Sequence, residues 1–245
     1  MKLAELTYEQ AAAQTDAIVL VPVGSTEAHG PHLPLNTDVI ISEELAKRTV
    51  TAIKSQGRSA LIAPSIAYSV TEYAAPFVGT VSIPPDAAIT LIAEICRALQ
   101  RQGFRRICLI NSHLEPAHIE TLRRACTRVL DDGGTQVAFP DCTERRWART
   151  LTEEFKRGAC HAGRYETSLV LAVCPERVHP ARSLLPPQPI DLAQAMRTGA
   201  KTFIEAGADR AYFGEPAEAT AAEGEVIYSL LLAMVLTTVD EVWST

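Results

Sequence analysis

Short apolar runs alternate along the chain with longer segments whose apolar residues recur at helical spacing. The run at residues 17–23, AIVLVPV, is rich in Val and Ile and ends at Gly24, so it predicts a buried strand. Similar runs predict strands at 59–64, 105–111 and 135–140. Helical spacing of apolar residues, with caps and breakers at the ends, predicts helices at 37–54, 86–101, 116–130, 163–173, near 191–206 and at about 222–242.

This order of elements predicts the fold class. Strands that alternate with helices require parallel crossover connections and a sheet covered by helices on both faces. We therefore expect an α/β protein, a three-layer α/β/α arrangement around a mostly parallel sheet, and the 245 residues fit one domain spanning 1–245. The segment 64–85 is too long for a plain connection, so it is expected to be functional or to form an oligomer contact.

Composition and charge exclude some classes of function for this chain. Hydrophobic residues make up 47% of the chain and charged residues 21%, which is ordinary for a folded globular protein. A net charge of -6 argues against nucleic acid as a partner, because binding to phosphates needs clustered Lys and Arg. The N-terminal residues do not resemble a secretory signal, and we expect no membrane span and a cytoplasmic location. The six cysteines form no C-x-x-C pair and are expected to be reduced thiols.

Residues suited to metal binding follow two of the predicted strands. Glu27, His29 and Asp38 follow the strand at 17–23, and His113 and Glu115 follow the strand at 105–111. In open α/β sheets, ligands bind beyond the carboxyl ends of the strands. A spacing of two in an extended loop places both members of each Glu/His pair on the same side, and Asp38 could bridge two ions. Nitrogen and oxygen donors without Cys suit two divalent ions of zinc or manganese.

Single His and Cys residues in these segments also have structural interpretations. A lone His after a strand is more often a hydrogen-bonding loop residue than a ligand, so the prediction depends on the whole cluster. His118, one turn into a helix, and His179, in a proline-rich connector, are expected to be structural. A Cys160 nucleophile paired with His161 is disfavoured because adjacent residues rarely face each other. The chain has no G-x-S-x-G, P-loop, G-x-G-x-x-G or H-E-x-x-H motif.

Four segments together resemble the creatininase (creatinine amidohydrolase) family in order and spacing: VPVGSTEAHGPHLPLNTD, NSHLE, HAGRYETS and FGEPAEATAAEGE. The resemblance implies an α/β/α enzyme with two divalent metal ions per chain, zinc or manganese, and a homo-oligomer, a hexamer. It also implies that Glu27, Asp38 and His113 hold one ion, while His29, Asp38 and Glu115 hold the other.

The resemblance also assigns two catalytic residues in HAGRYETS. His161 would be a proton donor or acceptor, with Glu166 close to it at the centre. From the sequence alone, His161 could equally cap the helix that follows. A surface position for Glu166 fits poorly, because it lies between Tyr165 and the apolar run SLVLAV.

The chain also departs from the family pattern. Many relatives have Gly-His-Gly-Gly-Asn where this chain has SHLEP, although the creatinine-type branch keeps His-x-Glu there. Many have Glu-His where this chain has Glu72-Tyr73, which predicts a different substrate contact. The tryptophans that close over creatinine have no clear counterpart, since only Trp147 precedes His161. These differences disfavour creatinine itself.

The resulting hypothesis is a metal-dependent amidohydrolase. It would cleave a non-peptide C–N bond in a small-molecule cyclic or linear amide, using a water activated by two metals. One alternative is a peptidase-like family member that acts in cofactor maturation. A second alternative is a catalytically inactive, metal-binding assembly protein, although the presence of His161 and Glu166 speaks against it.

Overall fold

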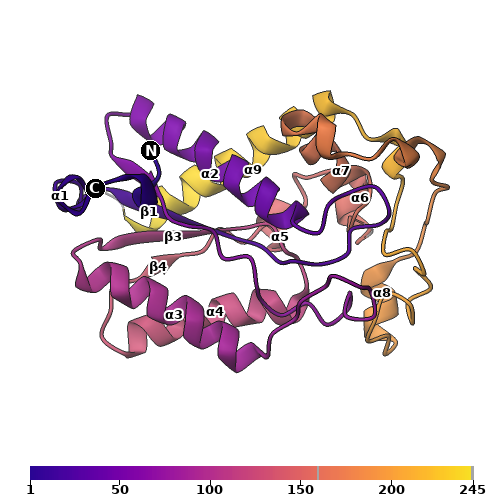
Figure 1. The fold of residues 1–245 in the computed structure, drawn as a ribbon, viewed down its shortest axis with the longest axis horizontal. Helices are drawn as coiled ribbons and strands as arrows, with labels where there is room; N and C mark the ends of the chain where they lie inside the picture. Colours follow the sequence, from indigo (N-terminus) through magenta and orange to yellow (C-terminus); the bar gives the residue numbers. More distant parts are fainter. Residues whose placement is uncertain (159, 244–245) are drawn as a thin grey trace.

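Parallel strands form the centre of the fold in the computed structural model, which describes residues 1–158 and 160–243 (Figure 1). Within these residues the sheet has the strand order β2-β1-β3-β4, and every neighbouring pair is parallel. The strands are β1 (Ile18–Val23), β2 (Ala60–Ile62), β3 (Arg106–Asn111) and β4 (Val137–Ala138). The apolar runs of the sequence therefore become the buried sheet that they predict.

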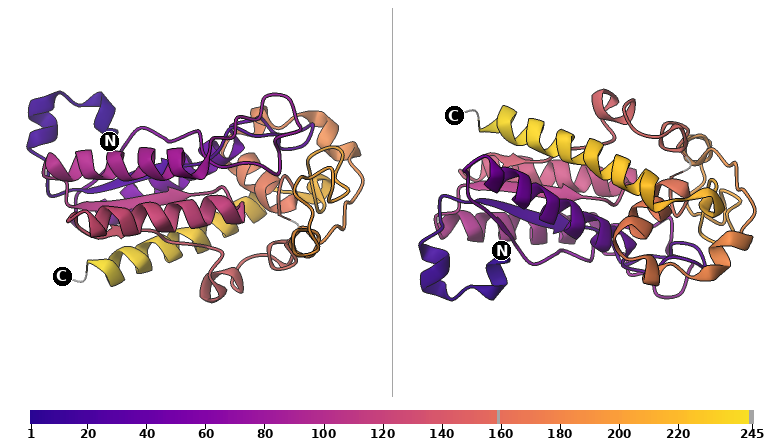
Figure 2. Two further views of the ribbon diagram at one scale, coloured as in Figure 1. Left: turned by 90° about the horizontal axis from the view of Figure 1, so that it is seen from below. Right: turned by 90° about the horizontal axis from the view of Figure 1, so that it is seen from above.

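Helices cover both faces of this sheet. The α-helices are α1 (Tyr8–Ala12), α2 (Thr37–Ser55), α3 (Pro85–Arg101), α4 (Pro116–Asp131), α5 (Arg145–Ala148), α6 (Glu153–Lys156), α7 (Arg164–Val173), α8 (Leu192–Arg197) and α9 (Ala221–Val242). Short 3-10 helices add η1 (Leu3–Glu5), η2 (Pro175–Arg177), η3 (Pro180–Leu184) and η4 (Pro216–Glu218). Figures 1 and 2 show α3 and α4 on one side of the sheet, with α2 and α9 on the other.

The two helical layers bury opposite sides of the same strands. Along β1, Ile18 and Leu20 pack into a core with α2, α7 and α9, whereas Val19 and Val21 pack into a second core with α3 and α4. Successive residues of a strand point to opposite faces, so a run that is apolar throughout can be buried on both sides. This arrangement is the predicted three-layer α/β/α fold.

The C-terminal helix α9 differs from one expectation. It is long and apolar enough to cross a membrane by length and composition, whereas no such segment was expected. In the fold it contributes Ile227, Leu231 and Val235 to the core that it shares with α2 and α7. Gly224 allows this packing, because a Cβ there would clash with the backbone carbonyl of Ser168 in α7. The position of α9 in the core therefore explains its apolar composition.

Other differences lie at element ends and in short helices. The helix expected near 191–206 is only α8, because Gly199 takes a φ of 107° directly after the C-cap Thr198. Strands β2 and β4 are shorter than their apolar runs. The short helices α1, α5 and α6 were not predicted, although Thr7 and Gln10 form a capping box at α1.

The fold brings the loops after β1 and β3 to one edge of the sheet. Because these two strands are parallel and paired over their whole length, both end at the same edge. The first turns of α2, α4 and α7 begin near this edge. A small third cluster, formed by Ala28 and by residues from 73–77 and 190–213, packs beside it, and we call this the satellite cluster.

Candidate metal centre

The loop after β1 approaches the start of α2 closely. A Cβ on Gly24 would lie 2.7 Å from the Cβ of Asp38, so only glycine allows this approach. The backbone N–H of Ser25 donates to Asp38 Oδ2 at 3.2 Å. Asp38 is therefore fixed in the first turn of α2, with Glu27 and His29 from the same loop buried beside it.

His29 presents one ring nitrogen to the carboxylates. Its Nδ1 lies 3.1 Å from the carbonyl oxygen of Glu27, an acceptor, so this nitrogen is the donor. Its Nε2 lies 3.2 Å from Asp38 Oδ1, 3.5 Å from Glu166 Oε2 and 3.7 Å from Glu27 Oε1. The ring orientation thus leaves Nε2 facing three carboxylates.

His113 adopts the complementary orientation from the loop after β3. Its Nε2 donates to the carbonyl of Val70 at 2.8 Å. Its Nδ1 faces Glu27 Oε1 at 3.1 Å and Asp38 Oδ2 at 3.3 Å. Glu27 and Asp38 therefore each lie near His29 Nε2 on one side of the cluster and near His113 Nδ1 on the other.

Burial and charge strongly perturb these groups. Burial acts to lower the pKa of His29, but Asp38, Glu166 and Glu27 outweigh it and raise this pKa to about 10. Burial likewise opposes ionisation of Glu27, yet His113 holds its pKa well below the ordinary value. Among the described residues, His29 Nε2 and Asp38 Oδ1 are buried polar atoms without a hydrogen-bond partner. Such atoms are costly to bury unless something binds them, and a cation would satisfy both.

Within the described part of the chain, three sets of side chains could each hold an ion, with ligand atoms within 4.8 Å of one another. They are Glu27, Asp38 and His113; His29, Asp38 and Glu166; and Glu27, His29 and His161. The first set consists of the residues that the family resemblance assigns to one ion. The second differs from the predicted set, because Glu166 takes the place of Glu115.

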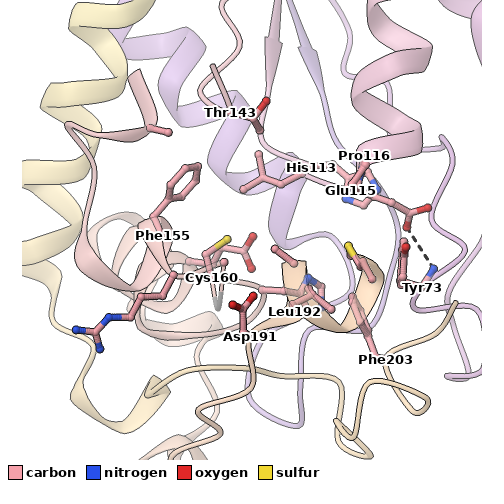
Figure 3. Close-up of a pocket in the computed structure, with 18 of the residues that line it drawn as sticks. Tyr73, His113, Glu115, Pro116, Thr143, Phe155, Cys160, Asp191, Leu192 and Phe203 are labelled. Atoms are coloured by element: carbon pink, nitrogen blue, oxygen red, sulfur yellow. Dashed lines mark hydrogen bonds between the residues drawn. The ribbon is translucent and has the colours of Figure 1, made fainter. Parts of the chain in front are cut away.

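Glu115 is held apart from this cluster by backbone amides. It is the residue directly before α4, and its carboxylate accepts from the N–H groups of Glu72 at 3.1 Å and Tyr73 at 3.2 Å (Figure 3). Burial raises its pKa. Glu166, in the first turn of α7, instead reaches the centre, where its Oε2 also accepts from the N–H of Ala162 at 2.6 Å. Glu166 thus lies in the cluster where Glu115 was expected, and Glu115 lies beside the cluster on the amides of Glu72 and Tyr73.

His161 lies against the same cluster. Its Nε2 donates to the carbonyl of Ala28 at 3.0 Å, and its Nδ1 faces Glu27 Oε1 at 3.8 Å. Its ring lies between those of His29 and Phe203, with centroids at 4.5 Å and 4.3 Å. Burial, together with the charge of His29, lowers its pKa to about 4. The ring is therefore neutral near pH 7 and carries a free lone pair on Nδ1.

A cavity of about 460 Å³ opens onto this centre (Figure 3). Glu27, His113, Glu115, His161 and Glu166 all line it. The remaining lining comes from 143–158, Cys160, Leu114 and Pro116 where the β3–α4 loop meets α4, and the segment containing α8, together with Tyr73 and Phe203. The cluster is thus buried and still accessible to a ligand.

Several contacts of the centre were not predicted from the sequence. The 64–85 loop supplies the Val70 carbonyl, the Thr71 hydroxyl that donates to Glu27, and the amide of Tyr73. The unusual length of this loop indicated a function, and the departure at Glu72-Tyr73 indicated a contact there, but neither signal identified Val70 or Thr71. Phe203 gave no signal, because it lies in a polar segment far along the chain.

Two further histidines, His118 and His179, make contacts that fit the structural roles expected of them. His118 is buried in α4, where its ring contacts Ser69 Oγ at 2.6 Å and Asn111 Oδ1 at 2.8 Å. The side chain of His179 accepts from the N–H of Ala181 at the start of η3. Cys160 lines the cavity, but burial raises its pKa well above the ordinary value, which disfavours a thiolate nucleophile.

The parallel sheet and the buried cluster of His, Asp and Glu at its carboxyl edge define this chain as an α/β protein with a candidate metal site. The chain belongs to the creatininase family, since the family model described as creatinine amidohydrolase matches residues 4–239. It is therefore a creatininase-family hydrolase, and the predicted family is confirmed.

The names of two relatives give different activities. The chain is 33% identical over 227 residues to a mycofactocin precursor peptide peptidase of Mycobacterium tuberculosis, covering 89% of this chain and 82% of the relative. It is 29% identical over 188 residues to a creatinine amidohydrolase of Pseudomonas putida, covering 70% of each. Among solved structures, a mutant creatininase of the Zn-Zn type superimposes with a TM-score of 0.76 at 22% identity, covering 98% of this chain and 96% of that one. This superposition confirms the predicted fold.

Proposed function

We propose that this hydrolase cleaves an amide C–N bond at a divalent metal centre held by Glu27, His29, Asp38, His113 and Glu166. The observation that carries the proposal is a pair of buried atoms, His29 Nε2 and Asp38 Oδ1, which lie 3.2 Å apart with no hydrogen-bond partner, beside an accessible cavity. Both atoms are strong metal ligands, and both face further carboxylates.

The donor set fits two divalent ions. Glu27, Asp38 and His113 would hold one, and His29, Asp38 and Glu166 the other. Three carboxylates and two neutral imidazoles carry a charge that largely offsets two divalent cations. Oxygen and nitrogen donors favour zinc or manganese, and the similarity to a Zn-Zn creatininase supports this choice. When bound, such ions polarise an amide carbonyl and lower the pKa of a water molecule.

Two residues beside the ligands would handle protons. His161 is neutral near pH 7 and presents the Nδ1 lone pair toward the centre, so it can accept a proton there. Burial raises the pKa of Glu115, whose carboxylate is fixed on the cavity wall, where it can relay a proton to the leaving nitrogen. Both groups act from positions fixed by backbone hydrogen bonds.

Two substrate classes are candidates. A small cyclic or linear non-peptide amide is the first, supported by the similarity to creatinine amidohydrolase. A short peptide is the second. The cavity of about 460 Å³ falls within the range of about 300–1,000 Å³ that holds drug-sized ligands, which exceeds the needs of creatinine. The Mycobacterium peptidase also resembles more of the chain. We therefore favour the peptide.

Metal removal and a substrate panel test this proposal. The protein is stripped with a chelator, reloaded with zinc or manganese, and incubated with creatinine, a formamide and short peptides. We expect hydrolysis of a peptide that disappears on stripping and returns on reloading. Hydrolysis that persists without metal would overturn the metal-dependent function. A metal-loaded protein that hydrolyses none of the amides would favour a catalytically inactive assembly protein.

The hexameric assembly and cytoplasmic location remain predictions. Light scattering of the purified protein and fractionation of the native cells would test them separately from activity.

A further inference from the structure

The cavity beside the metal centre has an apolar part that the proposed chemistry does not use. Apolar side chains on its lining come from the β3–α4 loop, α5, α6, α8 and the segment after α8. They are Leu114, Ala148, Phe155, Leu192, Met196 and Phe203. Figure 3 shows Phe155, Leu192 and Phe203 pointing into the same pocket that His113 and Glu115 border. We call these six residues the apolar wall.

The apolar wall is formed in advance of any ligand. Phe155 packs against the ring of Tyr165 at a centroid distance of 5.0 Å, and Phe203 packs against Phe213 at 5.2 Å. Leu192 and Met196 belong to the satellite cluster together with Phe203. A preformed apolar surface gains more from a ligand than a flexible one does, because fewer side chains must be ordered on binding.

Outside the metal centre, four charged residues on the cavity lining are exposed: Lys156, Arg157, Asp191 and Arg197. Lys156 pairs with Glu153 at 2.8 Å and is exposed, and Arg197 donates to the Gln194 side chain at 2.8 Å. Asp191 is occupied as the N-cap of α8, where it accepts from Gln194. The apolar wall itself offers no polar side-chain atom, so a polar ligand side chain placed against it would lose its water without gaining hydrogen bonds from it.

We infer that the apolar wall binds a large apolar side chain of the residue next to the cleaved amide bond. The substrate is then a peptide in which Leu, Met or a residue of similar size flanks that bond. The inference rests on the proposed function, and it adds the substrate preference that the metal ligands alone do not define. Each buried methylene adds to transition-state binding, so discrimination between Ala and Leu is expected.

Tripeptides of the form Gly-X-Gly test this preference with the metal-loaded enzyme. The X residues are Ala, Leu, Met, Asn and Gln, so that Leu is compared with isosteric Asn and Met with Gln. Products are identified by mass spectrometry, which reports the bond that is cut. We expect kcat/KM for Leu and Met to exceed that for Ala, Asn and Gln by about tenfold or more.

Matched variants locate the preference in the apolar wall. Leu192→Ala and Met196→Ala shorten two of its side chains, and each should reduce the Leu-to-Asn ratio of kcat/KM several-fold. Ile190→Ala is the control, because Ile190 packs on the satellite cluster but does not line this cavity, and it should keep the wild-type ratio. Thermal melting confirms that the variants fold.

The outcomes separate this inference from the proposed function. If all five tripeptides are cleaved at rates within about threefold, or if Ile190→Ala changes the ratio as much as the wall variants do, the inference is wrong and the hydrolase function stands. If none is cleaved by the metal-loaded enzyme, the peptide substrate is wrong and the inference fails with it.

Discussion

Asp38 uses its two carboxylate oxygens on different sides of the buried cluster. Oδ1 lies 3.2 Å from His29 Nε2, and Oδ2 lies 3.3 Å from His113 Nδ1. The backbone N–H of Ser25 fixes the carboxylate in this orientation. A carboxylate held between two imidazoles can bridge two ions, which is why both proposed ligand sets include this residue.

Glu115 and Glu166 should respond differently to the same substitution. Glu166→Gln should lose metal, because Glu166 belongs to a ligand set. Glu115→Gln should keep its metal and lose about 10²-fold or more in kcat, because it removes a proton carrier beside the ligands. Metal content by atomic absorption and steady-state kinetics of both variants measure this difference. Metal loss in Glu115→Gln with none in Glu166→Gln would restore the ligand set implied by the family resemblance.

Metal affinity should increase with pH. In the metal-free protein the pKa of His29 is raised to about 10, so below that pH Nε2 carries a proton that a metal must displace. The pKa of His113 is also raised, which adds to the effect. Binding near neutral pH should therefore release protons, and affinity should rise between about pH 6 and about pH 8. Calorimetric titrations in two buffers of different ionisation enthalpy measure the release, and identical heats would contradict it.

The sequence and the family resemblance predicted most of these residues and the set Glu27, Asp38 and His113, but not the second set. The spacing of two in Glu27-x-His29 and His113-x-Glu115 and the position of both pairs after strands indicated a cluster. Spacing alone could not show that the amides of Glu72 and Tyr73 hold Glu115 apart, because that contact spans more than forty positions. Spacing also could not show that the first turn of α7 places Glu166 beside His29.

At the scale of elements, the contact between α7 and α9 positions Glu166. Gly224 of α9 lies against the Ser168 carbonyl, so Gly224→Ala would force the two helices apart. Overpacking of this kind costs about 1–3 kcal/mol. We expect the melting temperature to fall by about 2–4 °C for each kcal/mol lost from the free energy of unfolding. Metal affinity should fall as well, because Glu166 is displaced with α7. The control is Ser229→Ala on the exposed face of α9, and an unchanged Gly224→Ala variant would contradict the prediction.

Long elements with a regular apolar pattern were predicted well, and short ones were not. The bounds of α2, α3, α4, α7 and α9 agree with the sequence within about two residues, because their apolar faces extend over several turns. The single-turn helices α5 and α6 lack such a pattern, although Thr152 caps α6 and Phe155 of α6 packs into the core. The loop 64–85 has no regular element, so its contacts depend on the final fold.

At the scale of the whole molecule, the parallel sheet explains why residues from distant segments meet. The loops after β1 and β3 end at one edge, and α7 and the satellite cluster close over it. This layout leaves a cavity with a polar floor and an apolar wall. The single domain spanning 1–245 remains a prediction, which limited proteolysis would test.

If two ions held through Asp38 make this chain an amide hydrolase, removing the Asp38 carboxylate should remove both the metal and the activity. Metal per chain and hydrolysis of the best substrate are determined for the wild type and for Asp38→Ala, with circular dichroism as the folding control. We predict about two ions per wild-type chain, and loss of both bound metal and activity in a folded Asp38→Ala variant. An Asp38→Ala variant that keeps two ions and full activity would contradict the account.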